Sequence, residues 1–154
     1  MNPIKRHKII QPLSREHHNG LLLCWKIRKG IIKSIDPDRI KKYSDWFYQK
    51  HLLPHFEIEE KYLFPILGDY NELVKRALAE HRKLKRLFEN QDEKIKSLSL
   101  IEEDLENHIR FEERILFNKI QEIATENELA LIASVHKDTQ LTDNWDDPFW
   151  EGLN

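Results

Sequence analysis

The stretch HFEIEE at residues 55–60 returns as HIRFEE at residues 108–113, and these two segments decide the fold. In each segment a histidine is followed four residues later by the first of two adjacent glutamates. On an α-helix, side chains four residues apart lie on one face, about one turn apart. Each copy therefore offers one imidazole and one carboxylate in the same direction. Two such helices facing each other in a bundle core would hold two metal ions.

Two further helical segments each carry a histidine upstream of one copy of this motif. The first offers His17 and the adjacent His18, and the second offers His81. Leu21 and Cys24 follow His17 at spacings typical of the apolar face of a helix. We therefore favour His17 as the ligand that points inward. His18 is turned by about 100° from it, and is the alternative ligand or lies at the edge of the pocket.

The candidate metal ligands share positions on apolar helical faces. A buried carboxylate without a compensating charge destabilises a fold strongly, and a metal centre supplies that charge. Imidazole together with carboxylate suits iron, manganese or zinc, whereas the lack of thiolates argues against an iron–sulfur site. The candidate ligands are His17, His18, His55, Glu59, His81, His108 and Glu112.

Other titratable residues lie close to these ligands in the sequence. Glu60 and Glu113, the second acids of the two motifs, are turned away by about 100°. We expect them on the surface, in ion pairs, or as hydrogen-bond partners of the ligands. His51 lies one turn before the first motif and could face the same pocket. His7 and His136 are expected on the surface.

Start and stop signals divide the chain into four long helices and a short fifth one. Ser14, which follows Pro12, is a good N-cap for the first helix, and capping pairs open the later ones. The pairs are Asp69 with Glu72, Ser99 with Glu102, and Thr125 with Glu128. The predicted helices cover residues 14–35, 37–67, 69–96, 99–124 and 125–136.

Pro54 lies inside the second predicted helix. Because proline lacks an N–H group and clashes with the preceding turn, we expect a kink or break at residues 50–54. Gly68 is expected to end this helix. Four long helices with short joints predict an all-α protein, an antiparallel up-down-up-down four-helix bundle with a short fifth helix and a C-terminal tail.

Length and composition are those of one amphipathic helical domain. We expect residues 1–154 to form a single domain, with the bundle core at residues 13–124 and the short helix and tail at 125–154. The 25 basic residues against 27 acidic ones give a net charge of -2, which does not support a nucleic-acid partner. No apolar run approaches the ~18 residues of a membrane helix, so we expect no membrane partner.

The single cysteine and the C-terminal tail each allow two interpretations. Cys24 excludes an internal disulfide and fits a reducing compartment. It is expected to be a buried small hydrophobe rather than a reactive thiol. With no secretory signal at the amino terminus, the expected location is cytoplasmic. In the tail, Trp145, Phe149 and Trp150 are expected to pack across the bundle, the alternative being an exposed contact for a partner.

Four stretches resemble the hemerythrin-like, or HHE cation-binding, family. They are LSREHHNGLLL at 13–23, LPHFEIEEKYLFPIL at 53–67, AEHRKLKRLF at 79–88 and NHIRFEERILF at 107–117. The resemblance implies a non-haem di-iron centre, in which two iron ions share an oxo or hydroxo bridge and two bridging carboxylates. The ligands that it implies are His17 or His18, His55, Glu59, His81, His108 and Glu112.

The chain departs from the oxygen-carrying hemerythrins, which have two histidines one turn apart on the third helix. Here His81 has Ala77 and Lys85 one turn away on either side. The HxxxE spacing on the fourth helix is closer to bacterial single-domain members and to iron-cluster repair proteins. The resemblance implies a protein that binds or senses dioxygen or a similar small molecule such as nitric oxide.

Two other functions remain open at this point. One is a di-iron redox enzyme, or an iron-donor or repair factor, that acts on peroxide, nitric oxide or damaged iron centres. The other is iron storage, for which a single closed site offers little capacity.

Overall fold

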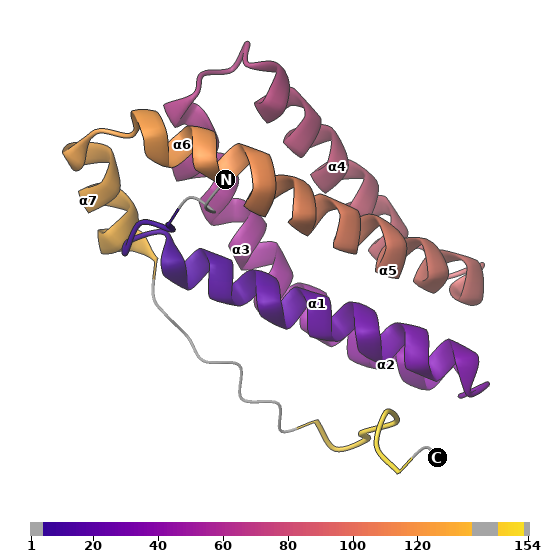
Figure 1. Ribbon diagram of the computed structural model, residues 1–154. Helices are drawn as coiled ribbons and strands as arrows, with labels where there is room; N and C mark the ends of the chain where they lie inside the picture. The colour runs from indigo at the N-terminus through magenta and orange to yellow at the C-terminus, as the bar shows by residue number, and fades with distance from the viewer. Residues whose placement is uncertain (1–4, 137–144, 153–154) are drawn as a thin grey trace.

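The computed structural model describes residues 5–136 and 145–152, and most of the first range is helical (Figure 1). The α-helices are α1 (Gln11–Ile32), α2 (Pro37–Phe47), α3 (Leu53–Ile58), α4 (Glu72–Glu89), α5 (Lys94–Phe111), α6 (Phe117–Ile123) and α7 (Glu126–Val135). Between them lie the π-helical turns η1 (Tyr48–Leu52), η2 (Glu59–Leu63) and η4 (Glu112–Leu116), and the 3-10 turn η3 (Phe64–Ile66).

These elements form four rods, which confirms the predicted four-helix bundle with a short fifth helix. The rods are α1, the continuous run from α2 to η3, α4, and the continuous run from α5 to α6. Helix α5 packs against both α1 and α4 (Figure 1). Helix α7 turns back at one end of the bundle and contacts η2 (Figure 1). Residues 145–152 lie near α1 and α2, where Trp150 contacts Lys26 and Tyr43. Among the described residues, no helix combines the length and apolar character needed to cross a membrane.

The start of α1 differs from the prediction. The helix begins at Gln11, because Pro12 fits the first turn, where no N–H donor is needed. Ser14 is therefore inside the helix and is not its N-cap. Its hydroxyl instead donates a hydrogen bond to Glu113 Oε2 at 2.9 Å. Ser14 therefore connects the first rod to the fourth rod instead of capping a helix.

The joint between the third and fourth rods also differs from the prediction. Helix α4 ends at Glu89 rather than near residue 96, and α5 begins at Lys94 rather than at residue 99. The side chain of Asn90 forms the joint by accepting hydrogen bonds from the backbone N–H groups of Asp92 and Glu93. Ser99 consequently lies within α5 and caps nothing.

The remaining helix starts and stops are partly as predicted. Thr125 and Glu128 form the predicted capping box, in which each side chain accepts from the other residue's backbone N–H. Gly68 ends the second rod with a positive φ of 90°, a conformation that favours glycine. The cap of α4 is Asn71, whose side chain accepts from two N–H groups. The predicted pairing of Asp69 is therefore wrong.

The second rod stays continuous at Pro54 because it widens just before it. At η1 the N–H of Leu53 reaches the carbonyl of Tyr48, five residues earlier instead of four. The wider turn accommodates the proline, so the expected kink is a π-helical turn. Two further π-helical turns, η2 and η4, begin at Glu59 and Glu112, the first acids of the two motifs. Such turns are frequent at functional sites.

The apolar core consists of two clusters of buried side chains. One gathers residues near the α2 end of the bundle, such as Leu23, Tyr43 and Leu105. The other gathers residues near the α7 end, such as Leu13 and Phe117. Along α1, His17 lies between the two clusters, and the other candidate histidines take the same place along their rods. A polar layer thus crosses the middle of the bundle.

Candidate metal centre

Six of the seven candidate ligands meet in this polar layer. Each is at most 4% exposed. Their donor atoms form two groups, and within each group the atoms lie within 4.8 Å of one another. One group contains His17, His55, Glu59 and Glu112, and the other contains Glu59, His81, His108 and Glu112. Both glutamates belong to both groups, so the arrangement offers two adjoining cation positions that share two carboxylates.

The imidazoles direct their Nε2 atoms towards the shared carboxylates. In the first group, His55 Nε2 lies 3.2 Å from Glu59 Oε2. In the second group, His81 Nε2 lies 3.2 Å from Glu59 Oε1. Across the layer, Glu112 Oε1 lies 3.2 Å from His17 Nε2 and 2.9 Å from His108 Nε2. Each of the two shared carboxylates thus faces one imidazole from each group.

Several polar atoms in this layer have no satisfactory hydrogen-bond partner among the described residues. They include His55 Nε2, both carboxylate oxygens of Glu59, and Glu112 Oε2. In addition, the Nε2 atoms of His81 and His108 face each other at 3.1 Å. Buried polar atoms are normally paired. Cations between these donors would satisfy them all, so the donor set fits a metal pair.

The second acid of each motif holds the outer nitrogen of one histidine. Glu113 Oε2 lies 3.0 Å from His17 Nδ1, and Glu60 Oε2 lies 3.0 Å from His81 Nδ1. An ionised carboxylate only accepts hydrogen bonds, so Nδ1 carries the hydrogen and Nε2 is left to face the centre. The adjacent glutamates of each motif therefore contact the two sides of one imidazole.

The other two histidines are held by acids that the sequence interpretation missed. His55 Nδ1 lies 2.8 Å from Glu16 Oε1, and His108 Nδ1 lies 2.7 Å from Glu80 Oε1. Glu16 directly precedes His17 in the sequence, just as Glu80 directly precedes His81. This repeated EH dipeptide was the available signal. Such outer partners fix the tautomer and orientation of a ligating imidazole and strengthen metal binding.

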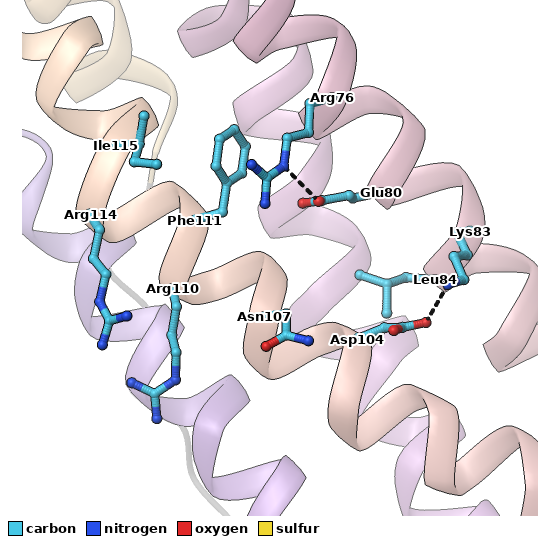
Figure 2. Close-up of a pocket in the computed structure, with 10 residues that line it drawn as sticks. All are labelled: Arg76, Glu80, Lys83, Leu84, Asp104, Asn107, Arg110, Phe111, Arg114 and Ile115. Atoms are coloured by element: carbon cyan, nitrogen blue, oxygen red, sulfur yellow. Dashed lines mark hydrogen bonds and ion pairs between the residues drawn. The ribbon is translucent and has the colours of Figure 1, made fainter.

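Among the described residues, three of the four outer carboxylates have a further hydrogen-bond partner. Ser14 donates to Glu113, Arg76 Nε donates to Glu80 Oε2 at 3.0 Å, and His136 Nε2 lies 3.0 Å from Glu16 Oε1. Figure 2 shows Arg76 reaching Glu80 on the wall of a groove between α4 and α5, while Arg110 and Arg114 point away from that pair. Because Glu80 lines it, the groove reaches the outer side of the polar layer.

The remaining histidines lie outside the two donor groups. His18 is exposed, and Trp25, seven residues later on the same edge of α1, is 45% exposed. That edge of the helix faces away from the centre. His51 packs on the rings of Trp46 and Phe47. His136 was expected on the surface, but its side chain is only 7% exposed.

Mutual contacts set the ionisation of the layer in the metal-free chain. Burial alone would lower the pKa of His55, but the carboxylates of Glu59 and Glu16 raise it to about 9. Burial opposes the charge on His108 too, but its carboxylate neighbours raise its pKa to about 10. Burial would raise the pKa of Glu59, yet the surrounding imidazoles hold it well below its ordinary value. Without metal, protons on the histidines therefore supply the compensating charge.

Comparison with known proteins supports the resemblance seen in the sequence. Residues 8–120 match the family described as Hemerythrin HHE cation binding domain. The match includes all six residues of the two donor groups and ends before α7. A search of curated proteins and a search of solved structures each found no match.

Proposed function

The chain belongs to the family of hemerythrin HHE cation-binding domains, and from that membership we propose that it is a non-haem di-iron protein that binds or senses dioxygen or a similar small molecule such as nitric oxide. The observation that carries the proposal is the presence of Glu59 and Glu112 in both groups of buried donors. Carboxylates placed in this way suit a bridge between two cations, and members of the family typically bind iron.

The donor chemistry supports iron with open coordination positions. Each proposed position receives two imidazoles and the two shared carboxylates, a mixed set suited to iron, manganese or zinc. When bound, a pair of iron ions would supply two exchangeable electrons and vacant positions for a small ligand. The protein contributes neutral imidazoles with fixed tautomers, shared carboxylates, and an apolar surrounding that excludes bulk water.

A small cavity beside the first donor group supports a small ligand. It has a volume of about 10 Å³ and touches the ligands His17 and His55. The rest of its lining combines the apolar side chains of Phe47, Leu52, Phe56 and Ile109 with the polar ones of Glu16, Asn19 and His51. A space of this size accepts about one water-sized molecule. It therefore suits a diatomic gas better than an organic substrate.

A second candidate function is a di-iron redox enzyme, or an iron-donor or repair factor, that acts on peroxide, nitric oxide or damaged iron centres. The observation that favours it is the similarity of the two donor groups, each with four protein donors. Both proposed ions would then have vacant positions, which suits electron transfer to a substrate as well as ligand binding. A cytoplasmic location remains part of the proposal, and it rests on the single cysteine.

Anaerobic loading with ferrous iron tests the proposed function. We expect two iron ions per chain, and visible absorption bands that appear with air and reverse under vacuum. Glu112→Ala should lose both the iron and the bands, whereas Glu106→Ala, on the same rod but outside the donor groups, should keep them. Zinc alone in the protein as purified, or two irons with no response to oxygen or nitric oxide, would contradict the proposal. Catalytic loss of peroxide would favour the enzyme.

A further inference from the structure

The two halves of the centre are alike except in what holds their outer carboxylates. Glu16 and Glu80 occupy equivalent places, one residue before His17 and His81. Glu80 is held by Arg76 at 3.0 Å, from one turn earlier on the same helix (Figure 2). Glu16 is held instead by His136 at 3.0 Å, from 120 residues further along the chain. The first half of the centre is therefore supported from a distant segment, and the second half from one turn away on its own helix.

His136 is held firmly at the end of α7. Leu129 and Ile132 of that helix are buried in the apolar cluster at this end of the bundle. The capping box of Thr125 and Glu128 fixes the start of the helix. His136 directly follows the helix, and its backbone N–H donates to the carbonyl of Ile132. The packing of α7 against the bundle thus positions the imidazole of His136.

A single oxygen of Glu16 joins His136 to a candidate metal ligand. Oε1 lies 3.0 Å from His136 Nε2 and 2.8 Å from His55 Nδ1. A carboxylate oxygen can accept two hydrogen bonds, so both nitrogens can donate to it at once. With its hydrogen on Nδ1, His55 keeps Nε2 free to face the centre.

Glu16 has competing partners close by. A cavity of about 480 Å³ opens beside it and is lined by Lys50, Lys61, His55 and His136, among others. Both lysines are exposed. Without His136, the carboxylate of Glu16 can turn towards these lysines or towards water, and His55 then loses the acceptor that fixes its ring.

We propose that His136 is a positioning residue for the cation position formed by His17 and His55. It holds Glu16 in the orientation that accepts from His55 Nδ1, and so keeps His55 Nε2 directed at the shared carboxylates. The inference rests on the proposed function and adds a positioning residue to the proposed site. His136 lies beyond residues 8–120, the part of the chain that matches the family, so the device belongs to the C-terminal part of this chain.

Substitutions at His136 test this inference on the full chain. The variants are His136→Gln, which keeps an N–H donor at similar reach, and His136→Asn, which is one methylene shorter. Chelator competition measures the affinity for ferrous iron, and Mössbauer spectra of ⁵⁷Fe-loaded protein report the two ions separately. His136→Asn should weaken the binding of one ion by about tenfold, the lower range for loss of an outer partner, and change one quadrupole doublet. His136→Gln should stay within about threefold of the wild type.

Two further variants serve as the counterpart and the control. Arg76→Leu removes the equivalent support of Glu80, so it should change the other doublet. His18→Leu replaces an exposed histidine on α1 and should change neither doublet. Circular dichroism and the thermal midpoint of the metal-free variants show whether each one folds.

Three outcomes separate this inference from the proposed function. If folded His136→Asn binds both ions as the wild type does, with unchanged doublets, the inference is wrong and the di-iron proposal stands. Equal changes in both doublets also overturn it, because they indicate a general loss of stability. A wild-type protein that holds fewer than two iron ions contradicts the proposed function itself.

Discussion

At the scale of single residues, each imidazole of the centre is contacted by carboxylates on both of its nitrogens. His17 faces Glu112 with Nε2 and Glu113 with Nδ1, at 3.2 and 3.0 Å. His81 takes the same position between Glu59 and Glu60 in the other half. In each half of the centre, two adjacent glutamates thus contact the two nitrogens of one histidine. This repeated contact explains why two adjacent acids follow each motif histidine. The second acid of each motif holds Nδ1 of a histidine on another rod, and the first acid faces Nε2 of the same ring.

The neighbouring histidines on α1 give a direct residue-scale prediction. His17→Leu should reduce bound iron from two ions to one or none per chain, because it removes a buried donor. His18→Leu should keep two ions, because His18 is exposed and lies outside both donor groups. Metal analysis after anaerobic loading and desalting measures both. Loss of iron in His18→Leu with full retention in His17→Leu would show that the ligand on α1 is wrongly assigned.

The six gathered side chains were predictable from the sequence because helical spacing alone places them on apolar faces. Glu16 and Glu80 were not singled out, because adjacent residues on a helix are about 100° apart. Which of them reaches a histidine depends on how the rods pack. The contact between His136 and Glu16 spans 120 residues, and no local pattern encodes it.

At the scale of elements, the sequence predicts the number and order of the rods better than their ends. The capping box at Thr125 was recognised because both of its partners are local. The joint at residues 90–93 is not predicted by the sequence, because Ser99 with Glu102 offers a capping pair of the usual kind nearby. The side chain of Asn90 places the joint earlier by accepting hydrogen bonds from the backbone N–H groups of Asp92 and Glu93. The π-helical turns at Glu59 and Glu112 leave no recognisable mark in the sequence.

The C-terminal segment gives an element-scale prediction. Phe149 is 1% exposed and packs its ring against Tyr43, while Arg39 holds Asp147 by two hydrogen bonds. The segment therefore packs on the bundle, the first of the two interpretations considered for the tail. Phe149→Ala should lower the free energy of unfolding by about 3 kcal/mol, as measured by urea denaturation.

Iron binding supplies the control for that experiment. Phe149 contacts α1 near Gly30. The difference of thirteen positions between Gly30 and His17 corresponds to about 20 Å along the helix, so the Phe149→Ala protein should still hold two iron ions. A fully stable Phe149→Ala protein would show that the segment does not pack in solution as it does in the structure.

At the scale of the whole molecule, the centre places a layer of charge across the middle of an otherwise apolar bundle. Without metal, its stability depends on protonated histidines beside ionised glutamates. Burial would raise the pKa of Glu16, but hydrogen bonds from His136 and His55 lower it to about 2. The prediction that residues 1–154 form one domain also belongs to this scale, and it stays a prediction.

These pKa shifts predict how the stability of the metal-free chain depends on pH. His55 and His108 have raised pKa values, so their contribution is full below the ordinary value of 6.5 and is lost as the pH rises towards 9 and 10. Glu16 has a lowered pKa, so its contribution is full above 4.5 and is lost as the pH falls towards 2. Stability should therefore be greatest between about pH 4.5 and 6.5.

Urea denaturation of the metal-free protein at several pH values measures this dependence. His18→Leu should show the same decline above neutral pH as the wild type, because His18 is exposed. In His55→Gln the decline should be smaller, because this variant lacks one of the two histidines with a raised pKa. A metal-free wild type that is equally stable at about pH 6 and pH 10 would contradict the assigned protonation of the layer.

Anomalous diffraction at the iron edge, from crystals of the loaded protein, tests the central claim most directly. The account predicts two iron positions within the polar layer, one beside His17 and His55 and the other beside His81 and His108, with Glu59 and Glu112 bridging them. A single position, or iron bound only at the surface while these six side chains keep their metal-free contacts, would contradict it.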